Sequence, residues 1–212
     1  MKKGIVIAGG SFADGKNIKK YINKDTVVVC ADAGLLHAES AGIKPDAVIG
    51  DFDSMPKPEG GEYELICHKA EKDETDTQLC IDYLLERNIR KIYIFGALGG
   101  ARVDHSIANI QLLEYGKDRG AGVVIKDKAT DIFLIDSESV SVAGHPGDTL
   151  SVFALNKAEG IYYKGLKYPL ENGTLTSGVP YCVSNSFAEE KAFVSVKKGK
   201  LLIIHIGGEK LE

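Results

Sequence analysis

The sequence predicts an α/β protein in two domains: a doubly wound, mostly parallel sheet with helices on both faces, followed by an all-β sandwich. Over residues 1–128, apolar strand-like runs alternate with helical patterns, which is typical of a parallel sheet covered on both faces. Over residues 129–212 the apolar runs are short, turn residues separate them, and no helical pattern of useful length occurs. The length of 212 residues suffices for both domains.

In the first domain, continuous apolar runs predict strands over 4–10, 26–34, 46–53, 63–68, 91–100 and 121–127. Helical spacing of apolar residues predicts helices over 15–23, 35–43, 77–88 and 105–120. Ligands of such sheets bind outside the carboxyl ends of the strands. The chemically suggestive loops fall at these ends: the Gly9–Gly10 pair, Asp32, the Asp51–Asp53 segment and the Gly96–Gly100 loop.

In the second domain, strands are expected over 130–138, 139–144, 148–155, 160–166, 180–187, 191–199 and 200–208. The dipeptides Asn172-Gly173 and Lys198-Gly199 are typical of hairpin turns, and we expect turns there. The change of pattern near Lys126–Thr130 predicts a short hinge between the two domains.

Composition argues against several classes of function. The net charge is −4 and no basic run is longer than the pair Lys197–Lys198, so no nucleic acid partner is expected and the substrate should be small. No apolar stretch has the length of a membrane span or of a signal-peptide core. The four cysteines lack metal-ligand spacing and lie in apolar runs, which predicts reduced, buried thiols and a cytoplasmic location.

The segment "GDFDS" places Asp51 and Asp53 two positions apart after an apolar run. In an extended backbone both side chains leave the same face, and like charges that close raise each other's pKa unless a cation lies between them. Turn formation is the plain alternative for these acids, with Ser54 capping the next segment of the chain.

The segment "KDETDTQ" is the start of an expected helix. Thr75 and Gln78 match a capping box, and the helix dipole favours Asp76 in the first turn. With Asp73 and Glu74 the segment holds more acids than a cap requires.

The segment "GALGGARVDH" has three glycines in five residues, at Gly96, Gly99 and Gly100, followed by Arg102 and Asp104. It lacks the Gly-Lys-Ser/Thr of a P-loop and the spacing of a dinucleotide fingerprint. A guanidinium beside a glycine-rich helix start is suited to bidentate contact with phosphate.

Carboxylate oxygens from several loops, with few histidines and no cysteines nearby, favour Mg²⁺ over zinc. In proteins Mg²⁺ is usually held between one or two carboxylates and the phosphates of a substrate. The acidic clusters therefore predict a Mg²⁺-dependent site for a polyphosphate, most simply a nucleotide.

The segments "ADAG", "GDFDS", "KDETDTQ", "GALGGARVDH" and "VSNSF" occur in the order and rough spacing of thiamin pyrophosphokinase, and this resemblance covers nearly the whole chain. It implies an enzyme that transfers pyrophosphate from ATP to the hydroxyethyl group of thiamin, giving thiamin diphosphate and AMP. It also implies a homodimer with composite active sites, in which thiamin lies between the α/β domain of one chain and the β domain of the other. Residues 1–128 would then bind nucleotide and catalyse, and residues 129–212 would bind thiamin and dimerise.

Matching motifs assign the site residues. The resemblance implies Mg²⁺ ligands at Asp51, Asp53 and Asp76, and catalytic roles at these three and at Asp73, Arg102 and Asp104. The ATP-binding residues would be Asp32, Asp51, Ser54, Thr75, Asp76, Arg102 and His105. Ser184, Asn185 and Phe187 would contact thiamin, with Phe187 or a tyrosine in place of the tryptophan that some members carry, since this chain has no tryptophan.

Two points stay open from the sequence. Either Asp73 or Asp104 is suited to accept the hydroxyl proton of thiamin. Two other functions also fit an Asp pair with a metal: a DxD-type glycosyltransferase acting on a nucleotide sugar, and a non-enzymatic nucleotide-sensing module.

Overall fold

The structure is a computed structural model that describes residues 2–12, 15–52, 60–69 and 71–207. The chain divides into two compact units, unit 1 (Met1–Lys128) and unit 2 (Ala129–Glu212). Asp53 and Ser54, two of the expected site residues, lie outside the described residues.

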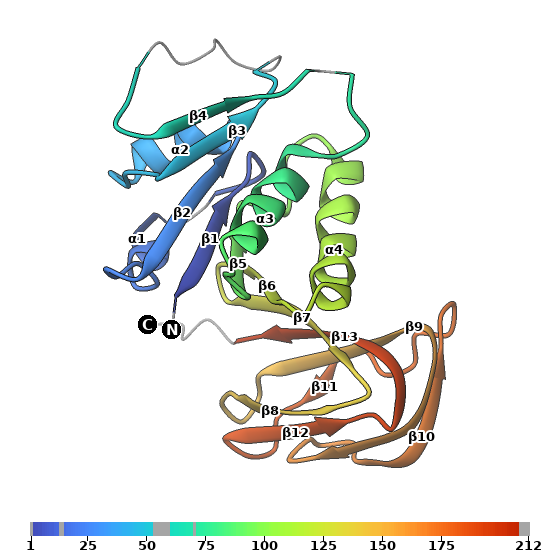
Figure 1. Cartoon of the computed structure of the whole chain (residues 1–212). Helices are drawn as coiled ribbons and strands as arrows, with labels where there is room; N and C mark the ends of the chain where they lie inside the picture. The colour runs from blue at the N-terminus through green and yellow to red at the C-terminus, as the bar shows by residue number, and fades with distance from the viewer. Residues whose placement is uncertain (1, 13–14, 53–59, 70, 208–212) are drawn as a thin grey trace. The chain divides into compact units, whose positions relative to one another are not determined.

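Unit 1 contains a parallel sheet with the strand order β4-β3-β2-β1-β5-β6 (Figure 1). The order reverses between β1 and β5, because the chain adds β2, β3 and β4 on one side of β1 and β5 and β6 on the other. Such a reversal opens a crevice at the carboxyl ends of the two central strands. The strands are β1 (Lys3–Ile7), β2 (Thr26–Ala31), β3 (Ala47–Gly50), β4 (Glu64–Cys67), β5 (Lys91–Phe95) and β6 (Gly122–Asp127).

Helices cover both faces of this sheet: α1 (Gly15–Lys19) and α2 (Gly34–Ser40) lie on one face, and α3 (Asp76–Glu86) and α4 (Val103–Asp118) on the other (Figure 1). The alternation of side chains along β1 shows why. Ile5 belongs to the buried cluster that includes Leu35 of α2, whereas a Cβ on the neighbouring Gly4 would lie 2.5 Å from Leu84 of α3. Successive residues of a strand face opposite sides, so apolar residues are needed at both.

Unit 2 is built from antiparallel strands, and β9 pairs with β13, β12, β10 and β11. Further antiparallel pairs join β13 to β7 and β12 to β8. The fold class predicted from the sequence is therefore confirmed. The strands are β7 (Thr130–Asp136), β8 (Ser139–Ala143), β9 (Thr149–Lys164), β10 (Leu170–Thr176), β11 (Asn185–Ser186), β12 (Lys191–Ser195) and β13 (Lys198–Ile206).

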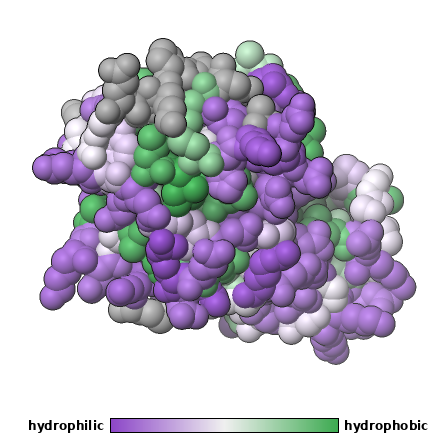
Figure 2. Space-filling model, turned by 45° about the horizontal axis from the view of Figure 1, so that its top comes forward, coloured by the Kyte–Doolittle hydropathy of each residue, from purple (hydrophilic) through white to green (hydrophobic). Residues whose placement is uncertain are grey.

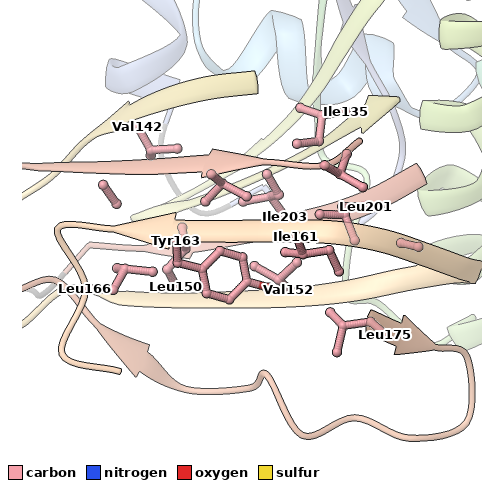
Figure 3. Packing of buried hydrophobic residues seen from close by; sticks show 14 of the residues in the cluster. Ile135, Val142, Leu150, Val152, Ile161, Tyr163, Leu166, Leu175, Leu201 and Ile203 are labelled. Carbon is pink, nitrogen blue, oxygen red and sulfur yellow. The ribbon is translucent and has the colours of Figure 1, made fainter. Parts of the chain in front are cut away.

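The core of unit 2 comes from the inward residues of these strands, and Figure 3 shows their side chains lying between the ribbons. Leu150, Ile161, Leu201 and Ile203 are fully buried there. Burial of a side chain of this size stabilises a fold by roughly 1.5–3 kcal/mol. Unit 2 thus has a hydrophobic core of its own.

Three local predictions for unit 2 are wrong for one reason, and the strand expected over 180–187 is also wrong, because only Asn185–Ser186 is strand there. The strands expected over 148–155 and 160–166 form the single strand β9, in which Asn156 and Gly160 have φ of 65° and 68°. Asn172 and Gly173 lie inside β10, where the register with β9 shifts. Gly199 lies inside β13 at a similar shift. Residues that favour positive φ suit a turn and a bulge equally, so the dipeptides did not distinguish the two.

The surface in Figure 2 is mostly hydrophilic, with smaller apolar areas between the polar residues. Within the described part of the chain, no helix is both long and apolar enough to cross a bilayer. All four cysteines are free, and Cys30 and Cys80 are buried as expected. Cys67 is exposed and Cys182 is only partly buried, contrary to the prediction. Cys67 lies in β4, which is the edge strand of its sheet.

Candidate active site

A cavity of about 450 Å³ lies in unit 1 at the carboxyl ends of β1, β2, β3 and β5, beside the amino ends of α3 and α4. This is the crevice that the reversal of strand order predicts. Its glycines come from the segments after β1 and β5. Its polar and charged lining residues are Asp32, Asp51, Lys72, Glu74, Thr75, Asp76, Thr77, Arg102, His105 and Asn109.

Asp51 and Asp76 converge on one cation, the ammonium group of Lys72. Lys72 Nζ donates to Asp51 Oδ2 at 3.2 Å and to Asp76 Oδ1 at 2.8 Å. The three side chains are only 12–22% exposed. Thr75 positions Asp76, since its hydroxyl accepts a hydrogen bond from Gln78 N and starts α3 as the capping pattern predicts.

The electrostatics of this cluster reflect its burial. Burial raises the pKa of Asp76, the charges of Asp51 and Asp32 add to this effect, and the hydrogen bond and charge of Lys72 only partly oppose it. Burial lowers the pKa of Lys72, but the hydrogen bonds and charges of Asp76 and Asp51 outweigh it and raise the pKa overall. Negative charge is thus in excess here, and positive charge stabilises the cluster.

The carboxylates of Asp51 and Asp76 are suited to bind one divalent cation. The position of Lys72 Nζ shows that Asp51 and Asp76 can both reach a single cationic centre. No group of three or more His, Cys, Asp or Glu with metal-site geometry occurs among the described residues, which do not include Asp53. Mg²⁺ needs only one or two protein carboxylates, because water and substrate phosphates complete its octahedral shell. Asp51 and Asp76 would hold it.

The backbone at Phe52 has a φ of 58°. The extended conformation that the sequence argument assumed between Asp51 and Asp53 is therefore wrong at its central residue. The argument that the side chains of Asp51 and Asp53 leave the same face therefore does not hold. The pairing of Asp51 with Asp76 on one cation could not be expected from the spacing of residues in the sequence.

Two glycine-containing segments form the floor of the cavity. Gly10 N donates to Gly96 O and Ser11 N to Leu98 O, each at 2.8 Å, and Gly100 N donates to Ser11 Oγ at 3.0 Å. A Cβ on Gly10 would lie 2.5 Å from Gly96 O, so this close approach requires glycine. The two loops therefore support each other as one rigid backbone surface.

Arg102 lines the cavity at the start of α4 and forms an exposed pair with Asp104. Its Nε donates to Asp104 Oδ1 at 2.9 Å and its Nη2 to Asp104 Oδ2 at 2.6 Å. The hydrogen bond with Arg102 lowers the pKa of Asp104 to about 2. Because both side chains are more than 60% exposed, a phosphate can compete for the guanidinium at little cost.

The structure brings most of the expected unit 1 residues together. Asp32, Asp51, Thr75, Asp76, Arg102 and His105 all line the cavity. Asp73 is exposed and, like Asp104, is not among the residues that line it.

Sequence reasoning missed Lys72 and Asn109. The signal for Lys72 was a lone basic residue directly before the acidic run "DETD". Asn109 is a buried polar residue of α4 whose amide donates to Ala97 O at 2.8 Å and supports the glycine loop. Its signal was an asparagine in an otherwise apolar stretch of helix.

The three expected thiamin contacts are in unit 2. Ser184 has a φ of 59° and its N–H donates to Ser151 Oγ at 3.0 Å. The Asn185 amide accepts from Tyr168 N at 3.0 Å and donates to Tyr168 O at 2.7 Å. Phe187 is only 3% exposed, and its ring lies 5.0 Å from that of His205. Its ring therefore belongs to the core of unit 2.

Two family models match the chain. The model "Thiamin pyrophosphokinase, catalytic domain" matches residues 18–125, and "Thiamin pyrophosphokinase, vitamin B1 binding domain" matches residues 136–201. The first range falls within unit 1 and the second within unit 2.

Individual proteins agree with the family models. The chain is 32% identical to the thiamine pyrophosphokinase of Bacillus subtilis, over 96% of this chain and 98% of that protein. Among solved structures it resembles thiamine pyrophosphokinase from Bacillus subtilis, with a TM-score of 0.86, 28% identity and coverage of 98% of this chain and 100% of that one. It also resembles thiamin pyrophosphokinase from Geobacillus thermodenitrificans, with a TM-score of 0.84, 27% identity and full coverage of both chains.

Proposed function

The chain is an enzyme of the thiamin pyrophosphokinase family, and from that premise we propose that it transfers pyrophosphate from ATP to thiamin in a Mg²⁺-dependent reaction. The products are thiamin diphosphate and AMP. One observation carries the proposal: the cavity of unit 1 combines converging carboxylates with a glycine-lined floor and an exposed arginine. These are the groups that a bound nucleoside triphosphate requires.

In the proposed reaction, the hydroxyl oxygen of thiamin attacks the β-phosphorus of ATP. The bond between that phosphorus and the oxygen bridging it to the α-phosphorus breaks, and AMP leaves with the bridging oxygen. Mg²⁺, held by Asp51 and Asp76, supplies charge neutralisation and orientation of the phosphates. Asp53, as a third ligand, stays a prediction.

The protein contributes positioning and electrostatics. Arg102 exchanges its exposed partner Asp104 for phosphoryl oxygens, and the start of α4, where Arg102 makes no side-chain cap, is suited to an anion through its backbone N–H groups. Asp32, Thr75 and His105 line the cavity and are suited to contact the nucleotide. Asp104, released from Arg102, and Asp73 both remain candidates for accepting the hydroxyl proton.

We assign thiamin binding to unit 2, with support from the match to a vitamin B1 binding domain. Ser184 and Asn185 are the proposed polar contacts, Ser184 through its hydroxyl and Asn185 through the second N–H of its amide group, since Tyr168 O accepts only one of the two. The buried ring of Phe187 does not favour direct stacking on thiamin. Tyr168, which Asn185 holds by its backbone, is 61% exposed and is the better aromatic candidate.

The deciding experiment incubates the purified protein with Mg-ATP, with and without thiamin, and separates the products. AMP and thiamin diphosphate in equal amounts are expected, and only when thiamin is present. ADP with thiamin monophosphate would mean terminal phosphoryl transfer instead. ATP binding without turnover would favour a sensing module. The matches do not favour the glycosyltransferase alternative, which a nucleotide-sugar assay tests directly.

We further propose a homodimer with composite active sites, with the family resemblance as support; a cytoplasmic location also stays a prediction. Asp51→Asn and Asn185→Ala subunits, each inactive alone, are mixed and allowed to exchange. In a mixed dimer of shared sites one site carries both defects and the other is intact, so about one quarter of wild-type activity returns. No recovery after verified exchange would mean that each site is built within one chain.

A further inference from the structure

Lys72 has no part in the proposed reaction, although its ammonium group is the closest cation to both Asp51 and Asp76 in the described part of the chain. Its side chain is 12% exposed, and it lines the nucleotide cavity. A surface lysine that forms an incidental ion pair would be far more exposed, as Lys44 is at 85% in its pair with Glu62. Lys72 is therefore built into the site.

The contacts of Lys72 and the proposed metal site require the same oxygens. Lys72 Nζ occupies the position on which Asp51 and Asp76 converge, within 3.2 Å of each. A divalent ion bound to the same two carboxylates would lie within a few ångströms of the ammonium, and like charges at that distance in a partly buried site repel strongly. The two cations cannot both occupy this position.

We propose that Lys72 is a positioning residue that competes with the divalent cation for Asp51 and Asp76. In the substrate-free enzyme its ammonium group holds the two carboxylates together and offsets their repulsion. When Mg-ATP binds, Lys72 is displaced and its ammonium group contacts the phosphates of the nucleotide. This inference rests on the proposed function for the identity of the nucleotide.

The local structure allows this exchange of partners. Lys72 precedes the first helical residue of α3, so its backbone is not part of the helix that fixes Asp76. A lysine ammonium is a point charge on four methylene groups and can turn between acceptors without the fixed geometry of a guanidinium. Lys72 and Arg102 line the same cavity, so both cations are available to a polyphosphate there.

The exchange of partners by Lys72 also makes the site selective for the complex of metal ion and nucleotide over the free metal ion. Displacing Lys72 leaves a partly buried ammonium group that needs a new anionic partner. A metal ion alone does not supply one, whereas metal with nucleotide phosphate does. The free ion should therefore bind weakly, and the ion with nucleotide should bind well.

The test is a titration with Mn²⁺, followed by electron paramagnetic resonance of the free ion, on protein without nucleotide or thiamin. Lys72→Met keeps the length of the side chain and removes its charge. We expect this variant to bind Mn²⁺ about tenfold more tightly than the wild type. We also expect it to bind the Mn²⁺ complex of a non-hydrolysable ATP analogue about tenfold more weakly, because the phosphate contact is lost.

The matched control is Lys44→Met, which removes a lysine from an ion pair of similar length on the surface and should change neither affinity. Unchanged or weaker Mn²⁺ binding by folded Lys72→Met would overturn the proposal, since a lysine with a purely structural role has no reason to oppose the ion. If Lys72→Met fails to fold, Lys72→Gln is titrated and judged by the same criterion. Because the titration contains no thiamin, its outcome is independent of whether thiamin diphosphate is formed.

Discussion

The two units use similar polar residues in opposite ways. In unit 1, Asp51 and Asp76 share the ammonium group of Lys72 at the edge of a cavity. In unit 2, Asp148 is 6% exposed, accepts from His145 N at 2.8 Å and lies 3.1 Å from His205 Nε2, and Asn185 binds the backbone of Tyr168 through both amide atoms. Two carboxylates thus share one cation in unit 1, whereas the buried side chains of Asp148 and Asn185 in unit 2 are paired with neighbours of their own.

This difference has a physical cause. Parallel strands bring their carboxyl ends to one edge, so polar residues that follow different strands must meet there and remain accessible. Antiparallel strands alternate in direction, and polar residues at their ends meet the turns of their own sheet. Substitutions of the cavity residues in unit 1 should therefore affect activity with little change in stability, whereas substitutions of the paired polar residues in unit 2 should also lower stability.

The largest expected effect is that of Asp51→Asn on activity. Loss of one carboxylate ligand should lower kcat/KM for thiamin diphosphate formation by more than about 100-fold. The free energy of unfolding should change by less than about 1 kcal/mol, because Lys72 keeps Asp76 as a partner and one repulsion is removed. Product formation and thermal unfolding measure the two effects. Wild-type activity, or a large loss of stability, would break the contrast between the units.

Arg102→Ala should give the next largest loss. If the guanidinium contacts phosphoryl oxygens, kcat/KM should fall by about tenfold to a hundredfold, with stability unchanged because the side chain is 66% exposed. Arg102→Lys is the matched variant, and it should recover only part of the activity since an ammonium group lacks the bidentate fork. Full activity in Arg102→Lys would show that charge alone is needed.

Asn185→Ala should lower stability in addition to the loss of activity expected from its proposed contact with thiamin. It leaves the N–H and C=O of Tyr168 without their partner, which should lower the free energy of unfolding by roughly 1–3 kcal/mol. Asn185→Asp keeps the acceptor and loses the donor, so an intermediate loss is expected. Calorimetry of both variants provides the measurement. An unchanged melting temperature in Asn185→Ala would mean that the amide serves a ligand and not the fold.

The sequence predicted what depends on local chemistry. The alternation of strands and helices, the Thr75 cap and the meeting of strand ends all follow from patterns that need no distant partner. It did not predict Lys72, because the direction of a long flexible side chain depends on charges from two other segments. Nor did it predict the continuous strand β9 or the buried ring of Phe187, because a bulge and a turn share their residues and core packing is not local.

The smallest expected effect concerns the exposed ion pair of Arg102 and Asp104, which contrasts with the partly buried contacts of Lys72 in the same unit. The hydrogen bond from Arg102 lowers the pKa of Asp104 from an ordinary 3.8 to about 2. Since the folded pKa lies below the unfolded one, the pair contributes to stability above about pH 4, and this contribution is lost as the pH falls through 2. It is small, because both groups face solvent.

An NMR titration of the Asp104 carboxyl carbon measures this pair directly. We expect a midpoint near 2 in the wild type, and a return toward 3.8 in Arg102→Ala and in 1 M salt, which screens exposed charges. The partly buried carboxylate of Asp76 should respond less to the same salt, since solvent ions reach it less. A wild-type midpoint near 3.8 would mean that Arg102 is already free of Asp104 in solution. Arg102 would then meet the phosphates of a nucleotide without first exchanging a partner, unlike Lys72.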